Sequence, residues 1–512
     1  MGSWIRTWLS RPDWAVAIFA LLAGTWRSGV PSYWTDEAAT IMSARRPLWS
    51  LMNMARNVDA VHTAYYFVMR GWIAVSGGAP AAVRLSSALA VALGAAALTA
   101  LARRMGWSVP WQAAAGVAFV LLPRMFYSAA NARSAAIEAL VAVLLMLCSL
   151  RAARARRPAL WWALFAAVLL IGSAIFVFTV LLIPVCAVML YADGHRVRGP
   201  YLRLGGWSLG VLVVLSPLLL LAQHQKGQIE FLAGRKVLDA HQIIDVQWFR
   251  SAPFSWIAWG LIVLAVLSPA IRAVWGTTRQ GDRWIAPLLC WMLLPMLILG
   301  SVSLVYTPVF TQRYVTNSAG AVALLLVFGV HELRVPARWM RGLLRREREC
   351  RIWGTVATAG VRGVVVVCAL LLLIPNLVQV REGTEMHRHA DWNRVAAVVG
   401  QYSHRGDAVL YDSVVRQSWS PRNIAHVYPS DFSGLHDVGL RTPYWKTGGL
   451  WDVSVPLSEV PARVRPYERV WTIQVRASRG AAALQDVMTP LGYSAEKTWR
   501  FSLDTVTLWT RG

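Results

Sequence analysis

The sequence predicts a polytopic α-helical membrane protein that ends in a small α/β domain. Of its 512 residues, 56% are hydrophobic and only 15% are charged, and its 27 tryptophans are far more than a water-soluble protein of this size usually carries. Apolar stretches of membrane-spanning length follow one another as far as residue 375, after which apolar residues become sparser. We therefore expect a transmembrane domain over residues 1–375 and a soluble domain over residues 376–512.

About eleven apolar segments approach the ~20 residues that one helical crossing needs. We expect spans at 13–30, 82–102, 108–123, 133–150, 158–173, 174–192, 204–222, 254–274, 284–305, 317–331 and 355–375. Pro31, Tyr33 and Trp34 follow the first segment, where a cleavage site would have small residues. This segment is therefore expected to be a retained span and not a signal peptide.

Arginine clusters set the expected orientation. Lysine and arginine number 51 against 26 acidic residues, a formal net charge of +25. The clusters lie at Arg6–Arg11, Arg103–Arg104, Arg151–Arg157, Arg196–Arg203, Arg272–Arg283 and Arg334–Arg351, each two expected spans from the next. The positive-inside rule then places all of them in the cytoplasm, with the N-terminus inside and residues 376–512 outside. The charge is expected to meet anionic lipid and not nucleic acid.

The first outer loop, residues 31–81, begins with the adjacent carboxylates Asp36 and Glu37. Carboxylates at the edge of a bilayer are costly to desolvate without a cation, a metal or a proton, so this pair indicates a functional site. Apolar residues recur at helical spacing through the loop, which indicates short amphipathic helices lying in the interface. The outer segments carry further polar and aromatic side chains, namely Asp59, His62, Tyr65, Tyr66, Arg124, Tyr127, Arg133, Lys226, Arg313 and Tyr314.

The last ~135 residues have the length and composition expected of a small soluble domain. Strand-like segments at 408–411, 470–475 and 498–509 alternate with helix-like segments at 391–403 and 480–492. This alternation predicts an α/β domain.

Five short elements, in this order, carry a resemblance to a known family. They are Asp36-Glu37, the element from Asp59 to Tyr66, Val83-Arg84-Leu85-Ser86, the turn from Tyr127 to Arg133, and Arg313-Tyr314. Together they resemble the protein-mannosyltransferase-like, family-39-type glycosyltransferases of the GT-C fold, over about residues 14–330. Relatives commonly have His-Pro-Pro-Leu-Tyr-Tyr where this chain has His62-Thr63-Ala64-Tyr65-Tyr66, and a glutamate where it has Asn131.

The resemblance implies a bacterial enzyme of the cytoplasmic (inner) membrane, with its active site on the outer surface. Such an enzyme moves a sugar, mannose first among the candidates, from a polyprenyl-phosphate donor to a glycan, lipid or protein acceptor with inversion. The family's first-loop acid corresponds to Asp36 as general base, while Glu37 is its partner, a metal ligand or a contact to a neighbouring arginine. No cofactor is certain, and a divalent metal ion is the candidate that the resemblance leaves open.

The remaining side chains are assigned to the two substrates. The donor phosphate is expected to meet Arg313 first, because a planar guanidinium binds phosphate through two hydrogen bonds. The further candidates for the phosphate are Arg133, Arg124 and Lys226. The candidates for substrate binding are Asp59, His62, Tyr65, Tyr66, Tyr127 and Tyr314.

Two other classes of function fit a polytopic chain. A transporter or flippase for a polyprenyl-linked substrate would show interrupted helices in matching halves and carboxylates at mid-membrane depth. This chain has its acids in the first outer loop and no matching halves, which favours the enzyme. An assembly protein that holds a partner through its C-terminal domain is the third interpretation.

Overall fold

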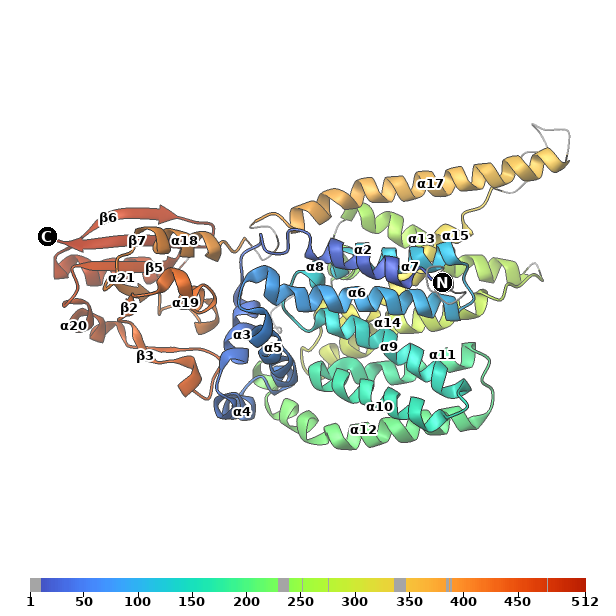
Figure 1. Ribbon diagram of the computed structural model, residues 1–512, viewed down its shortest axis with the longest axis horizontal. Coiled ribbons are helices and arrows are strands. Elements are labelled where there is room, and N and C mark those ends of the chain that lie inside the picture. Colours follow the sequence, from blue (N-terminus) through green and yellow to red (C-terminus); the bar gives the residue numbers. More distant parts are fainter. Residues whose placement is uncertain are drawn as a thin grey trace, which may run out of the picture.

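The computed structural model describes residues 11–228, 239–250, 252–274, 276–335, 347–383, 386, 389–476 and 478–512. A mainly helical part extends to Val380, and a part built on a five-stranded sheet follows it (Figure 1). The predicted fold class, a helical membrane protein with a C-terminal α/β domain, agrees with this architecture.

Each of the eleven predicted segments is helical. The helices are α2 (Asp13–Thr25), α6 (Pro80–Arg104), α7 (Val109–Leu121), α9 (Ala135–Arg154), α10 (Pro158–Ile175), η2 (Val177–Leu182) with α11 (Ile183–Ala192), α12 (Arg198–His224), α13 (Ala252–Val274), α14 (Ile285–Val305), η6 (Gln312–Ser318) with α15 (Ala319–Glu332), and α17 (Glu347–Val380). Among the described residues, eight helices are long and apolar enough to cross a membrane. A ninth span results if α7 and α8 (Pro123–Ala129), bent by 67°, are one crossing, whereas α2 and η2–α11 are shorter.

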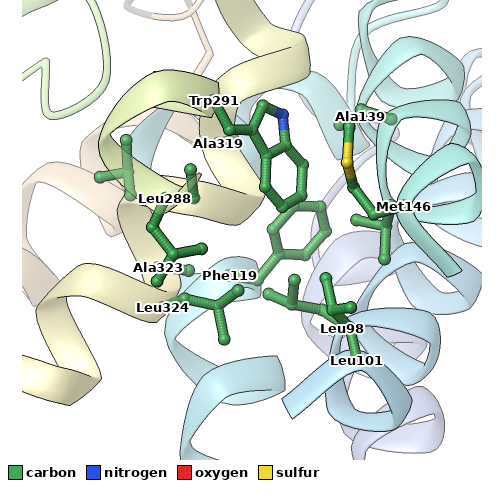
Figure 2. Packing of buried hydrophobic residues seen from close by; sticks show 14 of the residues in the cluster. Leu98, Leu101, Phe119, Ala139, Met146, Leu288, Trp291, Ala319, Ala323 and Leu324 are labelled. Carbon is green, nitrogen blue, oxygen red and sulfur yellow. The ribbon is translucent and has the colours of Figure 1, made fainter. Parts of the chain in front are cut away.

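Helices distant in the sequence meet in one buried core. Leu98 of α6, Phe119 of α7, Met146 of α9 and Trp291 of α14 lie together there (Figure 2). Small residues allow the helix backbones to approach closely, as is usual for membrane helices. At Gly329 of α15, an added Cβ would lie 2.2 Å from the carbonyl oxygen of a residue in α13, so only glycine fits.

The loop at residues 31–81, expected on the outer side, folds into the short helices that the sequence predicts. They are α3 (Thr35–Arg45), α4 (Leu48–Asn57), η1 (Ala60–His62) and α5 (Thr63–Ser76). These helices lie between the long helices and the sheet (Figure 1). One buried apolar cluster joins Tyr33 and Met54 of the loop to Trp392 and Trp471 of the C-terminal part. The loop is therefore packed from both sides.

The C-terminal part is a mixed α/β unit. Its main elements are α18 (Trp392–Tyr402), β1 (Ala408–Tyr411), α19 (Arg422–Val427), β2 (His436–Asp437), α20 (Val460–Val464), β5 (Arg469–Val475), α21 (Gly480–Met488), β6 (Tyr493–Arg500) and β7 (Asp504–Arg511). The strand order is β2-β1-β5-β7-β6, with β1 parallel to both neighbours and β7 antiparallel to both. A separate pair, β3 (Leu440–Thr442) and β4 (Val453–Ser454), is antiparallel.

At three places the chain differs from the elements expected from the sequence. The single strand expected at 498–509 is a hairpin of β6 and β7, because the chain turns where the Phe501 amide donates to the Asp504 carbonyl at 2.8 Å. The segment between the spans expected at 284–305 and 317–331 is helical from Gln312 onward. The segment between the spans expected at 108–123 and 133–150 contains the short helix α8, which begins at Pro123, a residue suited to a first helical turn.

Hydrogen bonds join the C-terminal part to both ends of α3. Before the helix, the Tyr33 amide donates to the hydroxyl oxygen of Tyr428 at 2.9 Å. After it, the Arg46 guanidinium donates to the carbonyl oxygens of Gly449 at 2.5 Å and Leu450 at 3.1 Å. The helix that carries Asp36 is thus attached to the C-terminal part as well as to the long helices.

The expected orientation leads to a labelling prediction. A cysteine at exposed Ser433 should react with a membrane-impermeant maleimide on intact cells, because the C-terminal part is expected outside. A matched cysteine at exposed Gln280, in the arginine-rich segment after α13, should react only after permeabilisation. The opposite pattern would reverse the orientation.

Candidate active site

Asp36 and Arg313 form an ion pair at the edge of the long helices. Asp36 lies in the first turn of α3, where a negative charge is favoured by the helix dipole. Its carboxylate accepts a hydrogen bond from Nη1 of Arg313 at 2.5 Å. The side chains remain 24% and 40% exposed, respectively. A ligand can therefore reach both groups.

Arg133 connects this pair to the second half of the loop. Its guanidinium donates to the backbone carbonyl of Asp36 at 3.2 Å and to Oγ1 of Thr40 at 3.3 Å. Its other terminal nitrogen lies 3.5 Å from Nε2 of His62. Two arginines therefore approach Asp36, one at its carboxylate and one at its backbone.

These charges determine the protonation of the site. Burial would raise the pKa of the Asp36 carboxyl, but Arg313 and Arg133 outweigh burial and hold the pKa below its usual value. Burial lowers the pKa of His62 to about 4, and the two arginines act in the same direction. At neutral pH, Asp36 is a carboxylate and His62 is a neutral imidazole.

Asp59 anchors the chain beside His62. Its backbone is left-handed, with φ of 63°, and its carboxylate accepts a hydrogen bond from the hydroxyl of Tyr66. Burial, with Asp59 adding to it, raises the pKa of Tyr66 well above its usual value, so the phenol keeps its proton. The amides of Asp59 and Ala60 donate to Gln228 and Gln225, at 3.1 and 2.9 Å. The two glutamines, which sequence reasoning missed, thus fix this turn.

Glu37 faces away from this site. Its carboxylate accepts hydrogen bonds from Arg84 at 2.8 and 2.6 Å and from the Ala132 amide at 2.9 Å. Both charged side chains are 0% exposed. Arg84 also donates to three carbonyl oxygens of residues 28–32. Adjacent residues on a helix point about 100° apart, which separates Glu37 from Asp36.

The other predicted phosphate ligands have different partners. Arg124 donates to the carbonyl oxygens of Gln247 at 2.6 Å and Val246 at 3.0 Å, so it holds the segment before α13. Lys226 contacts exposed Tyr306, at 3.3 Å between Nζ and the hydroxyl oxygen.

The predicted aromatic residues fall into two groups. Tyr65 and Tyr66 are buried in the first loop. The Tyr127 ring lies 4.2 Å from the Arg250 guanidinium, and Tyr314 packs against Phe176 and Phe178. The structure therefore brings together six of the candidates: Asp36, Arg313, Arg133, His62, Asp59 and Tyr66. The remaining candidates surround this group or face elsewhere.

These side chains do not themselves form a recognisable metal centre. Within the described ranges, no group of three or more histidine, cysteine, aspartate or glutamate residues could hold a metal ion. The Asp36 carboxylate is instead paired with Arg313, and the Asp59 carboxylate accepts a hydrogen bond from Tyr66.

Comparison with known proteins finds similarity to solved structures but to no family model or curated protein. The structure of ArnT from Cupriavidus metallidurans bound to undecaprenyl phosphate matches with 14% identity and a TM-score of 0.49, over 97% of each chain. The oligosaccharyltransferase AglB from Archaeoglobus fulgidus, in complex with an inhibitory peptide and a dolichol-phosphate, matches with 10% identity and a TM-score of 0.49, over 99% of this chain and 74% of that chain.

Proposed function

We propose that the protein is a GT-C-type membrane glycosyltransferase that moves a sugar from a polyprenyl-phosphate donor to a lipid, glycan or protein acceptor outside the membrane. The observation that carries the proposal is the partly exposed Asp36 carboxylate beside the long helices, which pairs with Arg313 while Arg133 donates to the backbone carbonyl of Asp36. A base next to cations at a membrane surface suits a substrate with a reactive phosphate and a lipid tail. The transmembrane domain, residues 1–375, would hold the chemistry, and the domain at 376–512 would lie outside.

The reaction is a single displacement with inversion. The acceptor hydroxyl attacks the anomeric carbon, and Asp36 takes the hydroxyl proton. The bond between the anomeric carbon and the phosphate oxygen breaks, and the electron pair leaves with the polyprenyl phosphate. Arg313 stabilises the negative charge of this leaving group, because its guanidinium has five N–H donors and Asp36 engages only Nη1.

Donor binding would also change the strength of Asp36 as a base. In the free protein Arg313 keeps the pKa of Asp36 low, which makes the carboxylate a weak base. A phosphate on Arg313 would offset part of that positive charge and raise the pKa of Asp36. The base would thus become stronger when the donor is in place.

The sugar would lie against the His62 side of the site. A neutral imidazole offers one donor and one acceptor to sugar hydroxyls, and Arg133 lies next to it. Asp59 and Tyr66 hold the turn that presents His62. Mannose remains the first sugar to test, and a pentose such as arabinose the second.

The proposal is tested by transfer from lipid-linked sugars. Membranes with and without the protein are incubated with radiolabelled polyprenyl-phosphate mannose, arabinose and other sugars, and label in acceptor material is counted. Protein-dependent transfer from one donor is the expected result. Protein-dependent movement of intact donor across the bilayer, without cleavage, would instead identify a transporter.

Arg313 provides a prediction on donor use and on pH. Arg313→Ala should lower kcat/KM for the donor by about 10²–10³-fold, the usual cost of losing one donor to a developing oxyanion. The same change should raise the pKa of Asp36. On acidification, the activity of the variant should therefore fall at a higher pH than that of the wild type. Arg103→Ala, which breaks an ion pair with Asp13 elsewhere, is the matched control. An unchanged pH profile and donor dependence would remove Arg313 from the phosphate site.

A further inference from the structure

A groove of about 490 Å³ lies on the outside of the long helices, away from Asp36. Ala166 and Leu170 of α10 line one side. The α12 side consists of Arg203, Gly206, Trp207, Gly210, Val211 and Val214. The two helices run side by side (Figure 1). A groove of this volume is in the range of small-ligand sites.

Two glycines keep the groove open. A Cβ added to Gly206 or Gly210 would meet nothing within 4 Å, in contrast to Gly329, where it would collide with backbone. Glycine inside a helix costs about 1 kcal/mol relative to alanine. Packing within the chain therefore does not require these glycines, and their effect is to leave space on the surface of α12.

The groove has one charged end. Arg203 is exposed, and none of the described residues gives its guanidinium a hydrogen bond or an ion pair. The 27 residues of α12 extend about 40 Å, longer than the ~30 Å hydrocarbon core of a bilayer. Its first turns, which contain Arg198 and Arg203, therefore reach the headgroup region, while Gly210 and Val214 lie deeper.

We propose that this groove binds an anionic phospholipid, with its phosphate on Arg203 and an acyl chain over Gly206 and Gly210. A guanidinium binds phosphate with two hydrogen bonds, and the positive end of the α12 dipole, with Arg198, adds attraction. The deeper lining is aliphatic and matches hydrocarbon. The site is independent of the glycosyltransferase proposal, since it shares no residue with the region around Asp36.

A second copy of the chain fits the groove less well. Glycines spaced like Gly206 and Gly210 often allow two membrane helices to pack together. A symmetric pair through this face would bring the two Arg203 side chains toward each other, and like charges would repel. Because Arg203 has no partner among the described residues, it favours an anionic occupant.

The test uses the full-length protein in detergent, with bound lipids counted by native mass spectrometry. Phosphatidylglycerol and phosphatidylcholine with identical acyl chains are titrated separately. The wild type should bind phosphatidylglycerol more tightly, and Arg203→Ala should reduce that preference about fivefold, as expected for one arginine near an anionic headgroup. Phosphatidylcholine binding should change little in this variant.

Variants that fill the groove distinguish lipid binding in the groove from nonspecific lipid binding elsewhere on the protein. Gly206→Leu with Gly210→Leu should abolish the tightest phosphatidylglycerol site. Gly199→Leu and Gly205→Leu, also in α12 with open space but outside the groove lining, should retain it. Equal binding of both lipids by the wild type, or retention in the filled groove, would overturn the proposal. If filling the groove turned a dimer into a monomer without changing bound lipid, the groove would belong to a second copy.

Discussion

Replacing Asp36 by asparagine is expected to lower sugar transfer by about 10²–10⁴-fold, the usual contribution of a general base. The amide has nearly the same shape but cannot take the acceptor proton. Asp36 is 24% exposed and lies at the end of a short helix, so the fold should tolerate the change. Transfer from the polyprenyl-phosphate donor and thermal unfolding are measured on the same purified preparation.

Asp13→Asn is the matched control for this experiment. Asp13 is also a carboxylate paired with an arginine, Arg103, but it lies at the start of α2. Its replacement should leave transfer within a fewfold of the wild type. If Asp36→Asn kept most of the activity, Asp36 would not be the base.

Replacing Glu37 by leucine is expected to destabilise the protein by about 3–5 kcal/mol, because it leaves Arg84 buried without its carboxylate. The melting temperature in detergent should fall well below that of Asp36→Asn. In the double variant Glu37→Leu with Arg84→Met, both charges are absent, so part of the stability should return. The recovery should be partial, because the Ala132 amide and the three carbonyl oxygens that Arg84 binds still lose their partners.

The conservative variant Glu37→Gln separates a structural role from a chemical one. Glutamine can still accept a hydrogen bond from Arg84 or from the Ala132 amide. Reduced stability with substantial transfer by the folded fraction is expected. A stable protein with transfer as low as in Asp36→Asn would make Glu37 part of the chemistry.

Sequence patterns predicted much of this fold because membrane helices and interfacial helices have strong periodic signals. The segments at 82–102 and 133–150 correspond to α6 and α9 within a few residues. The hairpin of β6 and β7 was missed because its turn, 501–504, lacks glycine and proline and has an apolar phenylalanine. Thr498 and Trp499 before the turn, and the continuous apolar and β-branched residues at 505–510 after it, made the segment resemble one strand.

The candidate site was predictable in its residue types and less so in its pairings. Asp36 and Arg313 are far apart in sequence, and only tertiary packing brings them to 2.5 Å. The separation of Asp36 from Glu37 depends on α3 beginning at Thr35, which fixes the direction of each side chain. The pairing of Arg84 was predictable in principle, since an arginine inside an apolar span requires a buried partner, and Glu37 is that partner.

The attachment of the C-terminal part to both ends of α3 affects how the protein can be engineered and how its sequence can evolve. Tyr428 and the segment at 449–450 bind the flanks of the helix that presents Asp36, so these pieces form one mechanical unit although nearly 400 residues separate them. A chimera that exchanges the C-terminal part alone would place foreign contacts on Tyr33 and Arg46. The transferable module is therefore the loop at residues 31–81 together with the C-terminal part, and sequence changes on one side are expected to be matched by changes on the other.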